Sequence, residues 1–226
     1  MDILELLKSL GETIAMTFLS TAVAYLVGFP LGIILQITSK NGIKPNPYVN
    51  KPLGIFVNIM RSIPCLLLIV ILLPVTRTIF GRGTGNWYTM LIPIIFASFG
   101  FISRIVETSL NEVDSGVIEA SKSMGATTFQ IIKKVLIIEA KPSLINGLTV
   151  AIINIIGLTA FAYDFGAGGL ISMAYSHYVN NTRDYLNGPN IWIILIVIVL
   201  LVQIIQESGL FISKKTDKRR KSLWKI

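Results

Sequence analysis

Five long apolar stretches constrain this chain more than any other feature of its sequence. They cover residues 13–37, 53–75, 87–103, 144–163 and 191–212. A bilayer core about 30 Å thick is crossed by roughly 20 mostly apolar residues in a helix. The chain is 53% hydrophobic and only 14% charged, whereas about a quarter of the residues in a soluble domain are charged. The sequence therefore predicts one all-α membrane domain over residues 1–226, with five transmembrane helices.

The distribution of basic residues predicts how these helices are oriented. Five spans place the two termini on opposite sides of the membrane. The tail 214–226 carries seven basic residues against Asp217, and cytoplasmic segments of membrane proteins are rich in Lys and Arg. With the tail inside, the linker 38–52 and the polar region 104–143 also face the cytoplasm, and together they hold seven lysines. This N-out, C-in topology explains the net charge of +8 without a nucleic-acid partner.

Residues 113–142, within the polar region, carry the pattern of two short helices. Asp114 is a good N-cap for the first of them. Gly125 suits the left-handed position that follows a helix. Thr127 and Gln130 match a capping box, which starts a second helix.

The first short helix is expected over residues 117–124 and the second to about residue 138. Apolar side chains that this pair of helices can offer to a partner are Val117, Ile118, Met124, Phe129 and Ile132. The residues alone leave two interpretations open. The pair is either a docking site for another protein or an amphipathic hairpin that lies on the lipid surface.

At this point the sequence resembles a known family. Glu-Ala-Ser-Lys-Ser-Met-Gly at 119–125 is similar to the Glu-Ala-Ala…Gly loop of ATP-binding-cassette importer permeases. Asn-Ile-Met-Arg-Ser-Ile-Pro at 58–64, Glu-Thr-Ile-Ala-Met-Thr at 12–17 and Gly-Ala-Gly-Gly-Leu at 166–170 resemble the methionine-importer permeases. The resemblance covers nearly the whole chain, including its length and its five spans.

The resemblance implies roles for particular residues. In this family the loop forms coupling helices that dock into a cleft of a separate ATPase subunit. The residues assigned in this way to ATPase coupling are Glu119, Ala120, Ser121, Gly125, Ala126 and Phe129. The residues of the other family motifs are Arg61, Ser62, Pro64, Gly166, Gly168 and Gly169. The implied partners are ATPase subunits, a substrate-binding lipoprotein, a second copy of the chain and membrane lipid.

Two positions depart from the family pattern. Ser121 replaces an alanine, which exchanges one small residue for another. About a dozen residues after the glycine the family usually has Leu-Pro, where this chain has Ile137-Ile138, and its nearest proline is Pro142. Because proline ends a helix sharply, the end of the second coupling helix is left open, out to Lys141.

The sequence contains no motif for nucleotide binding or catalysis. Gly-x-x-x-x-Gly-Lys-Ser/Thr is absent, so the ATP and Mg²⁺ of an ATP-driven cycle belong to a separate ATPase. His177 and Cys65 are the only histidine and cysteine, which excludes a zinc cluster. The chain is therefore expected to be no enzyme and to bind no cofactor or metal.

The fourth apolar stretch, 144–163, is unusually rich in small and polar residues. Asn154 and Gly157 are examples, and such residues serve either close helix packing or a solute pathway. A single chain with five spans has few helices with which to enclose a passage. A homodimer with the pathway on its two-fold axis is therefore the simplest solution. Phe161 follows these residues and either seals the passage as an apolar gate or packs at the membrane interface.

These features predict a multi-pass permease subunit in a bacterial inner or plasma membrane. The resemblance implies that this subunit imports D- and L-methionine by alternating access, coupled to a separate ATPase. The alternative within the same class is a permease for another small solute, such as a quaternary-amine osmolyte. A secondary transporter would need an intramembrane Asp/Glu relay, and the apolar stretches hold only Glu207. A non-transporting membrane scaffold would use residues 113–142 as a docking site only.

Overall fold

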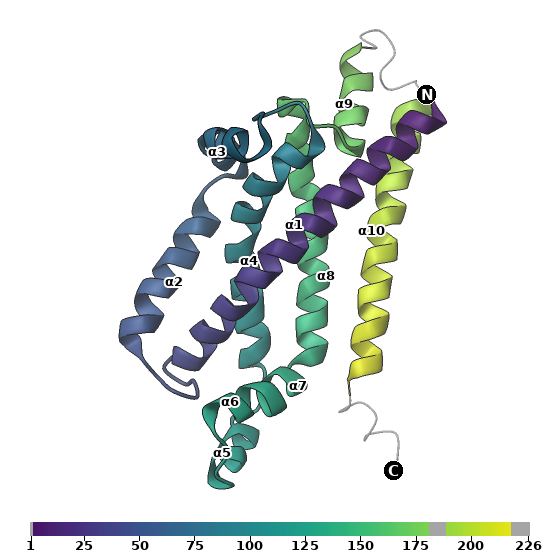
Figure 1. The fold of residues 1–226 in the computed structure, drawn as a ribbon. Coiled ribbons are helices and arrows are strands. Elements are labelled where there is room, and N and C mark those ends of the chain that lie inside the picture. The colour runs from purple at the N-terminus through teal and green to yellow at the C-terminus, as the bar shows by residue number, and fades with distance from the viewer. Residues whose placement is uncertain (1, 181–188, 218–226) are drawn as a thin grey trace. The chain divides into compact units, whose positions relative to one another are not determined.

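The computed structural model describes residues 2–180 and 189–217, and every element within them is helical (Figure 1). The elements are α1 (Ile3–Thr38), α2 (Pro47–Ser62), α3 (Cys65–Phe80), η1 (Trp87–Met90), α4 (Leu91–Asn111), α5 (Ser115–Ser123), α6 (Thr128–Ile131), η2 (Ile132–Leu136), α7 (Ile137–Glu139), α8 (Lys141–Leu158), η3 (Thr159–Phe165), α9 (Leu170–Asn180) and α10 (Pro189–Thr216). The predicted all-α class is confirmed. Most of the predicted basic tail, residues 218–226, lies outside the described residues.

Four segments of the described chain are long and apolar enough to cross a bilayer without help. They are Ile3–Thr38, Trp87–Asn111, Lys141–Phe165 and Ile191–Thr216. Taken together, α2 and α3 also meet this requirement, as one bent pair, which gives five spans. The helices are longer than predicted. At 1.5 Å per residue the 36 residues of α1 extend about 54 Å, well beyond a hydrocarbon core of about 30 Å.

The second predicted span, 53–75, is a broken helix and not a straight one. The chain bends by 99° where α2 ends at Ser62 and α3 begins at Cys65. Pro64 explains the break, because it lacks an amide hydrogen and forces the residue before it out of the helical conformation. Its own φ of −57° and ψ of 134° are not helical. The predicted family motif with Arg61, Ser62 and Pro64 therefore lies at this break.

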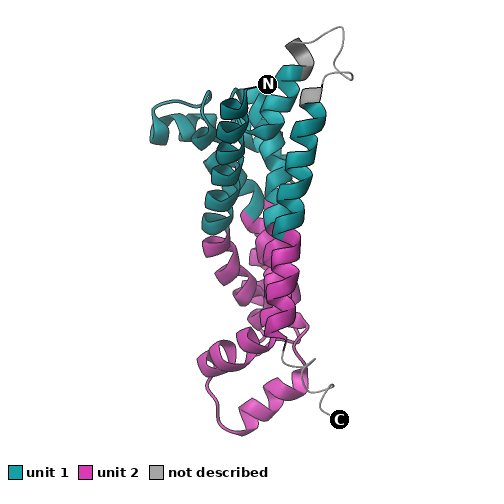
Figure 2. Cartoon of the chain, turned by 90° about the vertical axis from the view of Figure 1, so that its right-hand side faces the viewer, with its two compact units in different colours: residues 1–24, 62–98, 152–205 teal, residues 25–61, 99–151, 206–226 magenta. Residues whose placement is uncertain are grey.

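One compact unit of the chain is built around α4. It comprises Tyr25–Arg61, Phe99–Ala151 and Gln206–Ile226, magenta in Figure 2. Gly32 of α1 packs so closely on α4 that a Cβ there would lie 2.6 Å from the Ser103 carbonyl oxygen. On another side of α4, Ile105 occupies the space that a Cβ on Gly147 of α8 would need. Small residues thus allow the close helix approach that membrane proteins favour.

Polar contacts attach two more helices to this unit. The guanidinium of Arg104 in α4 donates to the Gly54 carbonyl of α2 at 3.0 Å. The hydroxyl of Ser213 in α10 donates to the Pro142 carbonyl at the start of α8 at 2.9 Å. Because the Pro142 carbonyl lies in the first turn of α8, α10 is fixed at the end of α8 that adjoins the polar region.

The other compact unit contains an additional helix, α9. The unit comprises Met1–Ala24, Ser62–Ser98 and Ile152–Ile205, teal in Figure 2. The segment 164–190 lies between the fourth and fifth apolar stretches, and Leu170–Asn180 form α9 within it. Leu170 and Met173 of α9 are buried with Ile194 of α10, and Leu6 and Leu10 of α1 pack against them. This burial of apolar side chains explains why the segment is helical.

Candidate functional site

The first short helix of the polar region, α5, spans Ser115–Ser123 and so begins two residues before the predicted range 117–124, but it has the predicted N-cap and the predicted glycine after its end. The carboxylate of Asp114 accepts a hydrogen bond of 2.7 Å from the amide two residues later and caps the helix. Gly125 follows the helix with a φ of 79°. Its amide donates to the Lys122 carbonyl at 2.9 Å, and the Ala126 amide donates to the Ser121 carbonyl at 3.1 Å. These two bonds are those of a Schellman motif, so the turn after α5 is fixed by its own backbone.

The second short helix begins at the predicted capping box. The Thr127 hydroxyl accepts from the Gln130 amide at 3.3 Å, and the Gln130 side-chain oxygen accepts from the Thr127 amide at 2.8 Å. Helical structure continues through α6, the π-helix η2 and α7 to Glu139, close to the predicted end at about residue 138. Ala140 separates α7 from α8, and Pro142 lies in the first turn of α8, where proline is tolerated.

Residues 114–139 therefore form a defined polar hairpin, with an inner and an outer face. Ile131 and Leu136 are buried on the inner face. Met124 and Phe129 on the outer face are 80% and 71% exposed. Large apolar side chains exposed together on a structured projection are typical of a protein contact surface.

The structure divides the six residues predicted to contact an ATPase. Those with exposed positions are Glu119, Ala120, Gly125 and Phe129. Ala126 is half-buried. Ser121 is buried, and its hydroxyl donates to the Val117 carbonyl at 2.8 Å. Ser121 thus lies on the inner face of the hairpin and not on its contact surface.

The polar hairpin is attached to its unit through α5 and through its C-terminal end. The ammonium group of Lys122 donates to the Ile43 carbonyl, in the loop between α1 and α2, at 3.2 Å. Nothing in the local sequence indicates this contact, since the two residues are 79 positions apart. At the other end only Ala140, which is 2% exposed, separates the hairpin from α8.

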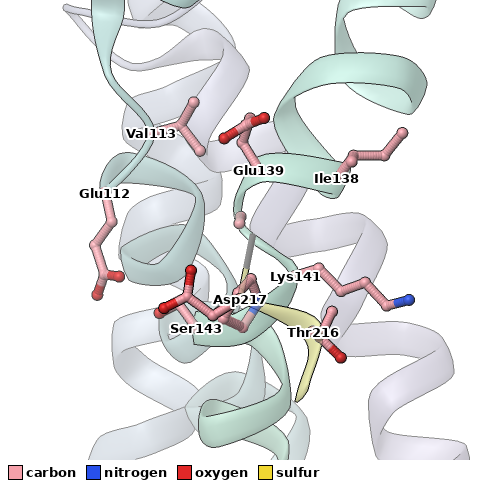
Figure 3. Close-up of a pocket in the computed structure, with 10 residues that line it drawn as sticks. Glu112, Val113, Ile138, Glu139, Lys141, Ser143, Thr216 and Asp217 are labelled. Carbon is pink, nitrogen blue, oxygen red and sulfur yellow. The ribbon is translucent and has the colours of Figure 1, made fainter. Parts of the chain in front are cut away.

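A cavity of about 440 Å³ lies where the hairpin meets α4, α8 and α10 (Figure 3). Its lining includes three carboxylates, those of Glu112, Glu139 and Asp217, and one ammonium, that of Lys141. Figure 3 shows Glu112 and Lys141 on opposite sides of the cavity.

Four residues of α8 form an exposed stripe along the helix. They are Asn146, Val150, Asn154 and Gly157, spaced by four, four and three positions, as on one face of a helix. Asn154 and Gly157 were predicted to serve either close helix packing or a solute pathway, and Asn146 and Val150 lie on the same face of α8. Phe161 follows in η3 and is half-buried. The nearby ring of Tyr163 packs on Tyr175 of α9, with the ring centres 4.0 Å apart.

The glycine motif at 166–170 joins the start of α9 to α1. The Glu12 carboxylate accepts from the Gly169 amide at 2.9 Å, and the Thr13 hydroxyl accepts from the Leu170 amide at 2.8 Å. The two α1 side chains thereby cap α9. A Cβ on Gly168, whose φ is 80°, would collide with the Glu12 carboxylate. The predicted motif residues Gly168 and Gly169 therefore serve this contact. Gly166, also left-handed, ends η3.

Arg104 was predicted to begin the polar region, but it lies inside α4, which continues to Asn111. Its guanidinium forms an ion pair with Glu107 at 2.6 Å and donates to the Asn58 side chain at 2.9 Å. These partners neutralise and hydrogen-bond the Arg104 guanidinium, so that α4 can carry a charge although it is otherwise apolar enough to span a membrane. The sequence signal was present in the Arg-x-x-Glu spacing. Among the described residues, no group of three His, Cys, Asp or Glu side chains is placed to hold a metal.

The comparison with known proteins extends over almost the whole chain. Residues 28–208 match the model of the family described as "Binding-protein-dependent transport system inner membrane component". The "Probable D-methionine transport system permease protein MetI" of Haemophilus influenzae is 39% identical over 208 residues, which are 92% of this chain and 95% of that protein. The "Methionine import system permease protein MetP" of Bacillus subtilis is 42% identical over 219 residues, 96% of each chain.

A solved structure has the same fold. A chain in "Inward facing conformations of the MetNI methionine ABC transporter" superposes with a TM-score of 0.89 and 35% identity, over 96% of this chain and 98% of that one.

Proposed function

The chain belongs to the family of binding-protein-dependent transport system inner membrane components, and on this premise we propose that it is the membrane permease subunit of an ATP-driven importer of D- and L-methionine. Two copies form the passage. Separate ATPase subunits bind ATP and Mg²⁺ and dock on the polar hairpin, and a substrate-binding lipoprotein delivers methionine from outside. The chain itself carries out no chemical reaction.

The polar hairpin is the observation that carries this proposal. Its first turn is closed by the Schellman bonds at Gly125 and its second helix by the capping box at Thr127. A segment with such fixed turns moves as one body. Met124 and Phe129 are exposed on it as apolar anchors, and anchors of this kind dominate the energetics of protein interfaces. The related proteins, named for methionine transport, support the choice of substrate.

The hairpin is also connected to the proposed passage. Ala140 is the only residue between α7 and α8, and the Ser213 hydroxyl holds α10 to the first turn of α8. When ATP brings the ATPase subunits together, a displacement of the hairpin is passed directly to the adjoining end of α8. This link is the physical basis of alternating access in the proposed mechanism.

The exposed stripe of α8 faces the passage in the proposed dimer. Asn146 and Asn154 supply polar groups, and Gly157 leaves room. Phe161, at the far end of the same segment, closes the passage in the resting state. The proposed topology has the N-terminus outside and the C-terminus inside. Cysteines at Glu5 and Lys215, in a Cys65→Ser background, should then react with an impermeant reagent from opposite sides of the membrane; labelling of both from one side contradicts it.

Reconstitution tests the proposed function. The chain is assembled in proteoliposomes with a partner ATPase and a substrate-binding lipoprotein, and uptake of radiolabelled D- and L-methionine is measured with ATP or with a non-hydrolysable analogue. We expect ATP-dependent, lipoprotein-dependent uptake of methionine and none of glycine betaine. Uptake of betaine but not methionine identifies the osmolyte permease. Uptake driven by an ion gradient without ATP contradicts ATP coupling, and a complex that assembles but moves neither solute supports the scaffold.

A further inference from the structure

Arg61 carries a charge at a position where a charge is costly. It is residue 15 of the 16 in α2, so it lies about 21 Å along the helix axis from Pro47 at a rise of 1.5 Å per residue. Pro47 lies within the lysine-rich linker 38–52 that the charge distribution places at the cytoplasmic surface, and Lys51, the last lysine of that linker, is ten residues or about 15 Å before Arg61. Arg61 is thus deep within a hydrocarbon layer about 30 Å thick. Charged side chains at such depth face a water-filled cavity or a functional partner.

The structure provides a cavity at this place. Arg61 lines a cavity of about 680 Å³ in the unit built around α4. Its stem crosses α4 at Gly100, where a Cβ would come within 3.1 Å of the Arg61 Cγ. The volume lies within the range of roughly 300–1,000 Å³ that small-molecule sites occupy. Gly100 therefore permits the arginine to reach this cavity from α2.

A second arginine, Arg104, lines the same cavity but already donates three hydrogen bonds. The Arg104 guanidinium is shared among Glu107, the Gly54 carbonyl and the Asn58 side chain. Within residues 2–180 and 189–217, by contrast, no hydrogen bond or ion pair engages the exposed Arg61 guanidinium. Arg104 therefore fixes α2 to α4, and Arg61 retains its full set of donors for a ligand.

The remaining lining residues are apolar, polar and acidic. Phe101, Ile105 and Val150 form an apolar wall, and Thr108 and Asn146 add side-chain oxygen atoms. Ser109, Ser143 and the carboxylate of Glu112 line the cavity as well, and a carboxylate suits the cationic amino group of a ligand. A ligand that suits this lining has an anionic group, an apolar side chain and a group that donates hydrogen bonds. An apolar α-amino acid combines all three.

We propose that Arg61 binds the α-carboxylate of the transported amino acid inside the permease, with the ligand's apolar side chain against Phe101, Ile105 and Val150. The inference rests on the proposed transport function and adds to it a binding site within the membrane subunit. A guanidinium recognises a carboxylate through two parallel N–H···O bonds, which an ammonium cannot form. The side-chain oxygens of Thr108 and Asn146 accept from the amino group.

Binding of tritiated L-methionine to the permease–ATPase complex in nanodiscs, without the lipoprotein, tests this site. Arg61→Gln should weaken binding about ten- to hundredfold, the effect of losing hydrogen bonds to a charged group. Arg61→Lys should recover part of the affinity, because it restores the charge but not the paired geometry. The matched control is Arg82→Gln, which removes an exposed arginine from the loop after α3 and should leave binding unchanged.

The wild-type complex provides a test that does not depend on the folding of a variant. Methioninamide keeps the side chain and amino group of methionine but replaces the carboxylate with a neutral amide. It should fail to displace tritiated methionine. Equal competition by the amide overturns the proposal, as does the absence of saturable binding.

Other roles for Arg61 give different results. If Arg61→Gln binds methionine with wild-type affinity, Arg61 has no role in binding it. This holds whether the guanidinium contacts a lipid headgroup or has no partner. If Arg61→Gln instead separates the two permease copies while the amide competes on the wild type, Arg61 pairs with the other copy and the proposal is wrong. A wild-type complex that imports no methionine contradicts the proposed function, whereas import with an unchanged KM in Arg61→Gln contradicts only this site.

Discussion

Gly125→Val tests whether the geometry of one turn couples ATP hydrolysis to transport. Gly125 has a φ of 79°, and a non-glycine residue in this left-handed region costs about 1–2 kcal/mol. A Cβ built at Gly125 meets no atom within 4 Å. The cost is therefore a property of the backbone, without any steric clash against the rest of the hairpin.

The strained turn has one way to relax, which is to leave the left-handed conformation. It then loses the two Schellman bonds, at 2.9 and 3.1 Å, each of which contributes about 0.5–1.5 kcal/mol. Strain in the left-handed turn thus costs about 1–2 kcal/mol, and its relaxation costs about 1–3 kcal/mol in lost bonds. A destabilisation of about 1–2 kcal/mol lowers the equilibrium constant for the turn that presents Met124 and Phe129 by a factor of about 5–30. Uptake per ATP hydrolysed should fall by up to that factor. The membrane-embedded helices are untouched, so assembly should persist.

Uptake and ATPase activity are measured together in the same proteoliposomes, and protein levels in the membrane report folding. Gly125→Asn is the matched control, because asparagine tolerates the left-handed conformation; it should retain most of the coupling. Wild-type uptake per ATP in Gly125→Val refutes the argument. Equal loss in Gly125→Asn and Gly125→Val would show that bulk at this position matters and backbone conformation does not.

Three further variants examine other contacts. Gly32→Leu places a side chain where α1 meets α4, and the overpacking, about 1–3 kcal/mol, should lower the thermal unfolding temperature. Gly11→Leu is the control, because a Cβ at Gly11 meets open space, and it should leave the unfolding temperature unchanged. Equal stability of the two variants contradicts the close packing of α1 on α4. Glu12→Ala removes the acceptor for the Gly169 amide at the start of α9. Because such a cap contributes about 0.5–2 kcal/mol, amide hydrogen exchange there should accelerate about 2- to 30-fold. An unchanged exchange rate rules out the cap. Phe161→Ala should let the resting complex leak methionine without ATP, and vesicles that stay tight with normal coupled uptake refute the gate.

The features that sequence reasoning predicted in detail are local ones. The N-cap at Asp114, the left-handed Gly125 and the capping box at Thr127 each depend on residues within three or four positions of one another. Such contacts form from neighbouring residues whatever the rest of the chain does, so their pattern can be recognised directly. The apolar stretches were equally visible, because membrane burial requires a continuous run of apolar residues.

The features that sequence reasoning missed depend on contacts between distant residues or on sequence signals that conflict with one another. The cap of α9 joins Glu12 to Gly169, which are 157 positions apart, and no local pattern encodes such a contact. The break at Pro64 had a clear signal, but the apolar run on both sides of it suggested one continuous span. Arg104 appeared to end a span because it is charged. Its neutralising partner, Glu107, lies within the same helix, and the helix therefore continues past both residues.

Site-specific photocrosslinking from the polar hairpin tests the central claim most directly. A photoreactive phenylalanine analogue is placed at Met124 or at Phe129, and the matched control is Phe211 of α10, another large apolar residue, which is 68% exposed. In membranes that also contain the ATPase, both hairpin positions should crosslink to the ATPase subunit and Phe211 should not. Crosslinking of the ATPase to Phe211 with none to Met124 or Phe129 would contradict the account that the hairpin receives the force of ATP hydrolysis.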